Sequence, residues 1–282
     1  MNITEYTFET HLIDKPVKLL HLTDQHITGA DESDDDHARS EAERRKPVFY
    51  QEPLQAEKRF EQFLNYAEEN DFDGIVMTGD IIDFPSKYNL KFISEKLGSL
   101  KIPFAYAVGN HDWCYADERA CEDTKVIHFP EIEQAVGRNM RMDAIEIGGI
   151  IIATFDNALY KMKPEQTEFL RKQIETGKPV IAAFHVPMAV DTIIEPTVKV
   201  WGKTYLMNVS EELAKKYNCI YTIADAPTAE FCRLLAESEN VIGVFAGHVH
   251  LNDCGEFGNG KTQIVSHIGV CDFATAVTFL PM

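Results

Sequence analysis

The sequence has too few basic residues to balance its acidic ones. Among 282 residues, 45 are Asp or Glu and only 27 are Lys or Arg, which gives a formal net charge of -18 at pH 7. A surface with this charge repels the phosphate backbone of nucleic acids and the headgroups of anionic membranes. The composition therefore argues against a general polyanion-binding protein and against a protein that binds duplex DNA.

Long apolar segments and cysteine pairs are also missing. No apolar run approaches the roughly 20 residues that a membrane-spanning helix needs. The opening stretch MNITEYTFETH is polar and acidic, unlike a secretion signal. The six cysteines are scattered without a CxxC pair, so we expect reduced thiols. These absences predict a soluble, cytoplasmic protein that does not bind membranes. The GxSxG motif of serine hydrolases is absent too.

Apolar runs that alternate with amphipathic stretches predict an α/β domain with a mixed sheet. Between Ile145 and Phe155, Gly148-Gly149 predicts a hairpin turn. A helix is expected to begin at Pro164 and to end before Gly177. The other expected strands are 17–23, 74–77, 104–108, 180–184, 241–246 and a closing pair at 263–270 and 274–280, and the other expected helices are 55–70, 88–97 and 228–237.

Polar residues of a few types follow five of the expected strands. They are Asp24, His26, Asp80, Asp83, Asn110, His111, Asp112, His185, His248 and His250. In open α/β sheets the carboxyl ends of the strands share one edge, where ligands usually bind. The sequence therefore predicts one convergent site at the carboxyl ends of these strands.

The residue types at these strand ends indicate a metal site. In an extended chain alternate side chains share a face, so His248 and His250 would point the same way about 7 Å apart, as would Asp24 and His26. Imidazole and carboxylate ligands without thiolates suit Zn, Mn, Fe or Co. The candidate ligands exceed the needs of one metal with an open position. Two metals about 3.5 to 4 Å apart, bridged by a carboxylate, would use them all.

At these residues the sequence resembles the calcineurin-like metallophosphoesterase superfamily. Its motifs are DxH, GDxxD, GNH followed by an acid, a lone His, and GHxH, and all five occur here in that order from Asp24 to His250. The resemblance implies a four-layer α/β sandwich, in which two mixed β-sheets are flanked by helices, formed by a single domain of residues 1–282. It also implies a metal-dependent hydrolase that acts on small phosphomonoesters or phosphodiesters, including nucleotide-like ones.

The resemblance further assigns roles to individual residues. One metal would be held by Asp24, His26, Asp80 and His250, and the other by Asp80, Asn110, His185 and His248. A hydroxide bridging the metals would attack phosphorus in line. His111 would be the general acid or would stabilise the transition state, with Asp112 or Asp83 orienting it. Helix capping explains those two carboxylates equally well.

Two segments do not fit the family scaffold and are expected to influence substrate choice. Residues 29–53 contain the acidic run DESDDDHARSEAERRK, which predicts either a solvated or disordered loop or a lid over the metals. In a lid, Arg39, Arg44 and Arg45 could approach a phosphate. Residues 186–226 are expected to form a substrate wall, in which Trp201 or Tyr205 either stacks on a ring or simply packs.

Departures from known branches of the superfamily narrow the hypothesis. The protein phosphatase branch reads GDxVDRG and GNHE, whereas this chain reads GDIIDFP and GNHD. Purple acid phosphatases have a tyrosine ligand where this chain has Asp83. Proteins of this fold that have lost catalysis serve as binding modules, so a non-catalytic metal-binding or protein-interaction module is the alternative. The motifs favour neither monoester nor diester, and they fix neither the metal nor the oligomeric state.

Overall fold

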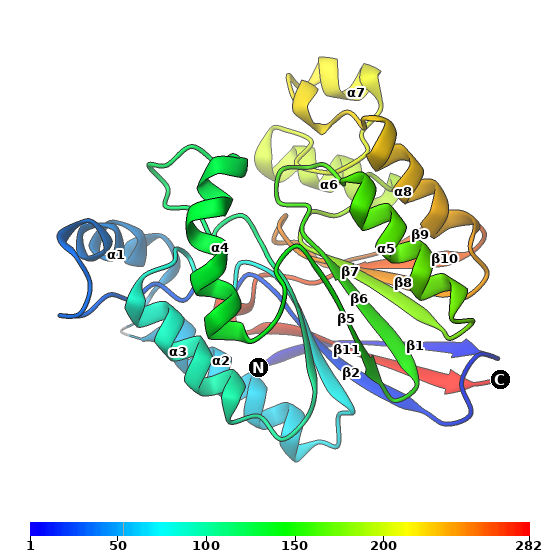
Figure 1. Cartoon of the computed structure of the whole chain (residues 1–282), viewed down its shortest axis with the longest axis horizontal. Coiled ribbons are helices and arrows are strands. Elements are labelled where there is room, and N and C mark those ends of the chain that lie inside the picture. The colour runs from blue at the N-terminus through cyan, green and yellow to red at the C-terminus, as the bar shows by residue number, and fades with distance from the viewer. Residues whose placement is uncertain (53) are drawn as a thin grey trace.

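The chain folds into two mixed β-sheets (Figure 1). The computed structural model describes residues 1–52 and 54–282. The first sheet has the strand order β1-β11-β2-β3-β4, with bounds Asn2–Thr10, Phe273–Pro281, Val17–Leu22, Gly74–Thr78 and Phe104–Ala107. The second has the order β5-β6-β7-β8-β10-β9, with bounds Met142–Ile147, Ile150–Phe155, Val180–Phe184, Val241–Ala246, Lys261–Val265 and Asp253–Phe257.

The sheets pack face to face because their strands are apolar on both sides. In β2, Val17 and Leu19 belong to the core between the sheets, whereas Leu20 and Leu22 belong to the core under the helices. Alternate side chains of a strand point to opposite faces, so one apolar run supplies both cores. The strands β2, β3 and β4 run parallel to one another, as do β6, β7 and β8, so within each sheet the ends of these strands share one edge.

Helices cover the outer face of each sheet and complete four layers, which confirms the predicted fold class (Figure 1). The helices beside the first sheet are α1 (Asp36–Phe49), α2 (Gln55–Glu69), α3 (Lys87–Gly98) and α4 (Glu122–Val136). Those beside the second are α5 (Pro164–Glu175), α6 (Asp191–Trp201), α7 (Glu211–Lys216) and α8 (Ala226–Glu237). Two single-turn 3-10 helices occupy Ile220–Thr222 and Gly269–Cys271.

Three expectations from the sequence differ from the structure. The opening stretch, for which no strand was expected, forms the edge strand β1. All but the last of its side chains are exposed or only partly buried, so no apolar run marks it as a strand. The two strands expected to close the chain as a pair lie in different sheets, because β11 inserts between β1 and β2. The predicted solvated or disordered loop is wrong for much of residues 29–52, because helix α1 occupies Asp36–Phe49. Residue 53 of that predicted segment lies outside the described residues.

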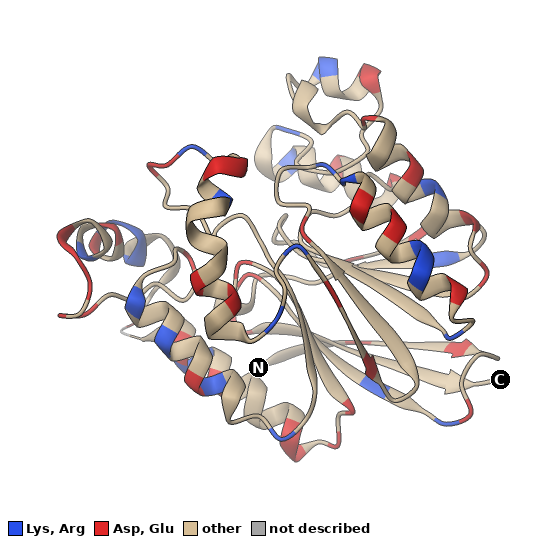
Figure 2. Ribbon diagram, viewed as in Figure 1, with Lys and Arg blue, Asp and Glu red and all other residues tan. Residues whose placement is uncertain are grey.

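Charged residues lie mainly on the helices and loops, and fewer of them lie on the strands (Figure 2). This distribution leaves the sheets as the apolar centre of the molecule and places the net negative charge on its surface. None of the described helices is long and apolar enough to cross a membrane.

Candidate dinuclear metal site

The loops that leave five parallel strands carry the ten predicted site residues. Asp24 and His26 follow β2, Asp80 and Asp83 follow β3, and Asn110, His111 and Asp112 follow β4, while His185 follows β7 and His248 and His250 follow β8. The two sheets contribute to the same cluster, because β2, β3 and β4 belong to one and β7 and β8 to the other. The structure thus brings together side chains that lie more than 220 positions apart in the chain.

One half of the site is a triad of a buried carboxylate, a buried imidazole and a partly exposed one. His250 Nε2 lies 3.2 Å from Asp24 Oδ1 and 3.3 Å from His26 Nε2. His26 Nε2 lies 3.7 Å from the same Asp24 oxygen. These three atoms converge within the distance that one metal ion would span.

The other half is built around Asp80. Its Oδ2 lies 3.0 Å from His185 Nε2, which in turn lies 3.2 Å from His248 Nδ1. Asp80 also groups with His26 and His111, so its carboxylate stands between the two halves. Asn110 lines the same cavity as Asp80 and His248. A shared carboxylate between two nitrogen-rich clusters is the arrangement that a bridged pair of metals requires.

Two oxygen atoms in the site are buried without a hydrogen bond to any described residue, and this tests whether metals fit. They are Asp24 Oδ1 and Asn110 Oδ1. A buried polar atom without a partner is costly, so such atoms usually indicate an ion or water that they bind. Backbone amides hold one carboxylate oxygen each of Asp24 and Asp80, because Asp24 Oδ2 accepts from His248 N at 3.0 Å and Asp80 Oδ1 accepts from His111 N at 2.8 Å. The set of donors therefore fits two cations.

The second ring nitrogen of three histidines is also engaged. His26 Nδ1 lies 3.0 Å from Asp83 Oδ1, and His185 Nδ1 donates to the Thr78 carbonyl at 2.6 Å. The Tyr160 hydroxyl lies 2.8 Å from His248 Nε2. Contacts of this kind fix the tautomer and orientation of a metal-binding imidazole. Sequence reasoning missed Tyr160, which belongs to no metal motif and lies in the loop after β6.

The predicted side-by-side projection of ligands from extended chain is wrong in detail. Five of the seven predicted ligands have a left-handed backbone, with φ values between 46° and 69°; they are Asp24, His26, Asp80, His248 and His250. Residues other than glycine seldom adopt this conformation, and clusters of them occur at functional sites. The strands end before the ligands, and the left-handed turns then direct the side chains into one cavity.

Charges in the cluster shift the pKa values of its members. Burial by itself would lower the pKa of His26, but the neighbouring Asp24 and Asp83 raise it to about 10. Burial would likewise lower the pKa of His185, but the charge of Asp80 raises it to about 9. Burial and then the charge of His185 lower the pKa of His248 to about 3. In the metal-free chain two imidazolium groups thus offset the carboxylates, and bound metals would displace their protons.

The two acids predicted to orient His111 lie in different places. Asp83 Oδ1 is 3.1 Å from His111 Nδ1 and is fully buried. Asp112 instead accepts hydrogen bonds from the backbone amides of Asp80 at 3.0 Å and Gly109 at 2.7 Å. Burial and then the charge of Asp80 raise the pKa of Asp112 to about 6. Asp83 is therefore the acid that contacts His111, and Asp112 ties the loops after β3 and β4 together.

Helix α1 reaches the site from within the acidic segment. Arg45 donates two hydrogen bonds to Asp83, from Nε to Oδ2 at 2.7 Å and from Nη2 to Oδ1 at 2.8 Å. The Phe49 ring stacks on His26 with 4.1 Å between ring centroids and 8° between planes. Arg39 and Arg44 pair with acids of their own helix instead, Asp36 and Glu41. Of the three predicted arginines, only Arg45 therefore contacts a predicted site residue.

Replacement of Arg45 by Gln should lower the free energy of unfolding by on the order of 3 kcal/mol, because Asp83 would keep a buried charge without its arginine. The matched control is Arg39→Gln, which removes an exposed pair with Asp36 and should cost less than about 1 kcal/mol. Urea unfolding of both variants measures the difference. Equal losses in the two variants would contradict this account of Arg45.

Loss of the Tyr160 hydroxyl in Tyr160→Phe should weaken the metal site at His248 by about 10- to 100-fold, because the imidazole would lose the group that orients it. The control is Tyr221→Phe, since Tyr221 packs on the Tyr160 ring but its hydroxyl faces Cys219. Metal titration of both variants by calorimetry resolves the effect. Unchanged metal affinity in Tyr160→Phe would assign the contact to packing alone.

A cavity of about 300 Å³ opens over the metal-binding cluster. Part of its wall is aromatic and comes from Tyr160, Trp201 and Tyr205. Trp201 is fixed by a hydrogen bond from Nε1 to the Val249 carbonyl at 2.9 Å, and its ring meets His250 edge-on at 5.4 Å. The predicted wall segment 186–226 thus places two of its aromatic residues at the site.

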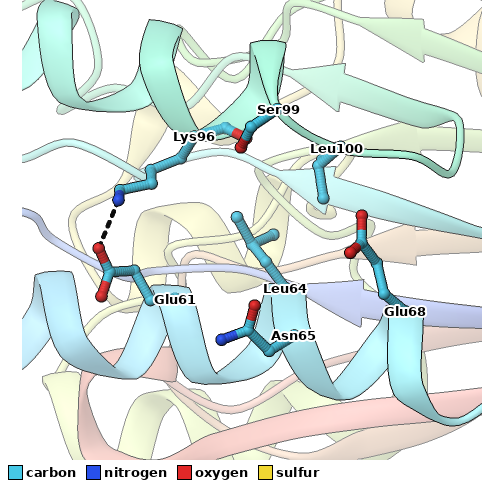
Figure 3. A pocket seen from close by; sticks show the side chains of 7 residues that line it. All are labelled: Glu61, Leu64, Asn65, Glu68, Lys96, Ser99 and Leu100. Carbon is cyan, nitrogen blue, oxygen red and sulfur yellow. Dashed lines mark hydrogen bonds and ion pairs between the residues drawn. The ribbon is translucent and has the colours of Figure 1, made fainter.

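Two other features with binding potential lie elsewhere. A cavity of about 280 Å³ between α2 and α3 is lined by residues such as Leu64 and Leu100 and crossed by the Lys96–Glu61 ion pair at 2.6 Å, and it contains none of the predicted site residues (Figure 3). The stretch GEFGNGKT, Gly255–Thr262, matches the GxxxxGK[ST] pattern of phosphate-binding loops. The structure makes it the turn between antiparallel β9 and β10, with no helix following, so it is not such a loop.

Comparison with known proteins identifies the family to which this fold and candidate site belong. Residues 17–252 match the family model described as calcineurin-like phosphoesterase, so the chain belongs to this family. No curated protein matches the chain in sequence.

Two solved structures align with the chain at low sequence identity, and the first of them supports the shared fold. A dimetal phosphatase from Danio rerio aligns with a TM-score of 0.51 and 11% identity, covering 91% of this chain and 89% of that one. The purple acid phosphatase PPD1 from yellow lupin (Lupinus luteus) aligns with a TM-score of 0.47 and 14% identity, and the alignment covers 90% of this chain and 44% of the lupin chain.

Proposed function

We propose that this chain hydrolyses small phosphate esters at a dinuclear metal site. The observation that carries the proposal is the convergence of carboxylates and imidazoles in which Asp80 groups with His26 on one side and with His185 and His248 on the other, beside a buried Asn110 Oδ1 that has no hydrogen-bond partner among the described residues. One cation would bind to Asp24, His26, Asp80 and His250, and the other to Asp80, Asn110, His185 and His248. A nitrogen and oxygen donor set without thiolates suits Mn, Fe, Zn or Co.

Two bound cations would supply a water of lowered pKa as nucleophile and positive charge for the phosphoryl oxygens. The chain itself positions these partners. Backbone amides hold one oxygen each of Asp24 and Asp80, so the free oxygens keep a fixed direction. Preorganised groups of this kind need no rearrangement when charge develops in the transition state.

His111 is the proposed proton donor to the departing oxygen. It lines the cavity with its side chain 26% exposed, whereas the imidazoles of His26 and His185 are buried. Its Nδ1 lies against Asp83, so Nε2 is the nitrogen free to face a leaving group. General acid catalysis by a histidine placed in this way is typically worth 10² to 10⁴ in rate.

The segments around the site would select the substrate. Arg45 and Phe49 of α1 stand beside His26 and Asp83, which supports a lid role for the 29–53 segment. Its acids serve partly as anchors, since Asp34 accepts from the backbone amide of Lys87 at 2.7 Å. The aromatic wall suits an apolar or ring-bearing group on the substrate, in keeping with a small phosphorylated molecule as partner.

The experiment that tests the proposal is hydrolysis of p-nitrophenyl phosphate and bis-p-nitrophenyl phosphate by chelator-stripped protein. The protein is reconstituted separately with Mn, Fe, Zn and Co, and a stripped sample without added metal is the control. We expect release of p-nitrophenolate only after metal is restored. Metal uptake without release from either compound under every condition would favour the non-catalytic alternative.

A further inference from the structure

A second cavity adjoins the metal-binding one. Its volume is about 700 Å³, and it runs from the site to the carboxyl end of α1 and to the loop near Ile268. The two cavities share three lining residues, His111, Trp201 and His250. They therefore meet at one rim, directly beside the proposed metal ligands and the proposed proton donor.

The second cavity has a largely apolar wall next to the site residues His26, His111 and His250, which also line it. Pro47, Val48, Phe49 and Ile268 line it, and Val48 is 62% exposed. Among its described lining residues, the only one with a permanent charge is Arg45, and its guanidinium is already engaged by Asp83 through two hydrogen bonds. An exposed apolar surface beside a polar site suits an uncharged, apolar part of a ligand.

The Trp201 side chain lines both cavities. Its edge-on contacts are with His250 at 5.4 Å and with Tyr205, on the metal-binding side, at 6.2 Å. A phosphate held at the shared rim would adjoin both cavities. A tetrahedral phosphodiester carries two substituents that diverge from phosphorus, whereas a monoester carries one and would leave a cavity empty.

We propose that the natural substrate is a phosphodiester whose apolar, uncharged substituent occupies the cavity formed by α1 and Trp201. Its other substituent lies along the aromatic wall at Tyr205. This inference rests on the proposed function and narrows its substrate class. It also gives the 29–53 segment a definite role, because the end of α1 supplies the apolar surface that recognises the diester.

The test is the binding of dimethyl phosphate and dibutyl phosphate to the manganese-loaded protein, measured by calorimetry. Each buried methylene contributes about 0.8 kcal/mol, so dibutyl phosphate should bind at least about tenfold more tightly than dimethyl phosphate. Val48→Asp should reduce this affinity ratio several-fold, and the milder Val48→Ser should reduce it less. The matched control is Val126→Asp on α4, where a valine of 67% exposure lies outside both cavities.

A double variant tests the use of both cavities. If the two butyl chains lie in separate cavities, Val48→Asp and Tyr205→Ala should each reduce the ratio, and their effects should multiply in the double variant. A ratio near one in the unmodified protein, or a double variant no weaker than either single variant, would overturn the inference. Hydrolysis of monoesters with no diester cleaved would also overturn the inference but leave the proposed function in place. Tight dibutyl phosphate binding without hydrolysis of any phosphate ester would instead contradict the proposed function and leave the apolar cavity in place.

Discussion

Asp80→Asn is expected to abolish stoichiometric binding of both metals and to reduce phosphoesterase activity at least about 10³-fold. Asp80 stands in both halves of the site, with Oδ2 3.0 Å from His185 Nε2. An amide cannot supply the negative charge that a bridging ligand shares between two cations. Loss of about 4 kcal/mol of transition-state stabilisation corresponds to the stated factor.

Metal content after dialysis, measured by elemental analysis, and turnover of bis-p-nitrophenyl phosphate check this prediction together. The control is Asp14→Asn, which neutralises an exposed acid in the loop between β1 and β2. Circular dichroism should show that both variants fold. Two metals per chain in folded Asp80→Asn, with ordinary turnover, would show that this carboxylate is no bridge.

His111→Ala is expected to retain both metals and to lose about 10² to 10⁴ in kcat. The loss should depend on the leaving group, because a proton donor matters most when the departing oxygen is strongly basic. We therefore expect a much larger loss with an alkyl phosphate ester than with a p-nitrophenyl ester, whose leaving group needs little protonation.

The matched control is His128→Ala, since His128 pairs with Glu118 and lines neither cavity at the site. Steady-state rates with the two leaving groups separate the roles of His111. An equal loss with both esters would assign His111 to stabilisation of the phosphoryl group and not to proton transfer. Turnover unchanged by His111→Ala would remove the residue from the mechanism.

The elements with strong local signals were predictable from sequence, and the weakly patterned ones were not. Apolar runs identified β2, β3, β7 and β8, and Gly148-Gly149 located the hairpin between β5 and β6. Strand β1 was missed because its mixed exposure at the sheet edge leaves no apolar run. Helix α1 was missed because its many charged residues, of both signs, outweigh the few buried apolar ones, such as Ala38 and Ala42, that hold it in place.

The meeting of the ten predicted site residues was also predictable, because parallel strands end at a common edge. Their local geometry was not. The left-handed turns at residues such as Asp24 and His248 depend on loops that bond to one another, as when Asp24 N donates to the Gly79 carbonyl at 3.0 Å. No local pattern encodes such contacts between distant segments.

The residues that support the ligands were hidden for the same reason. Tyr160 contacts His248 across 88 positions of sequence, and Arg45 contacts Asp83 across 38. Tyrosine and arginine are common in loops and on helices, so only the fold shows which of them reach the site. Likewise, only the structure shows that Asp83 contacts His111 whereas Asp112 binds backbone amides, since both acids follow strands in the same way in the sequence.

The binding-module alternative and the enzyme differ in what they require of the site. A module that only holds metal needs the ligands but has no use for His111 held against Asp83, or for two cavities that meet beside it. The structure contains both features. Their presence favours catalysis, and the leaving-group dependence of His111→Ala separates the two functions directly.

The central claim is that two metal ions share Asp80. Anomalous diffraction from crystals of the manganese-loaded protein tests it most directly. The account predicts two peaks about 3.5 to 4 Å apart, one beside Asp24, His26 and His250 and the other beside Asn110, His185 and His248. A single peak at full occupancy under saturating manganese, or peaks away from Asp80, would contradict it.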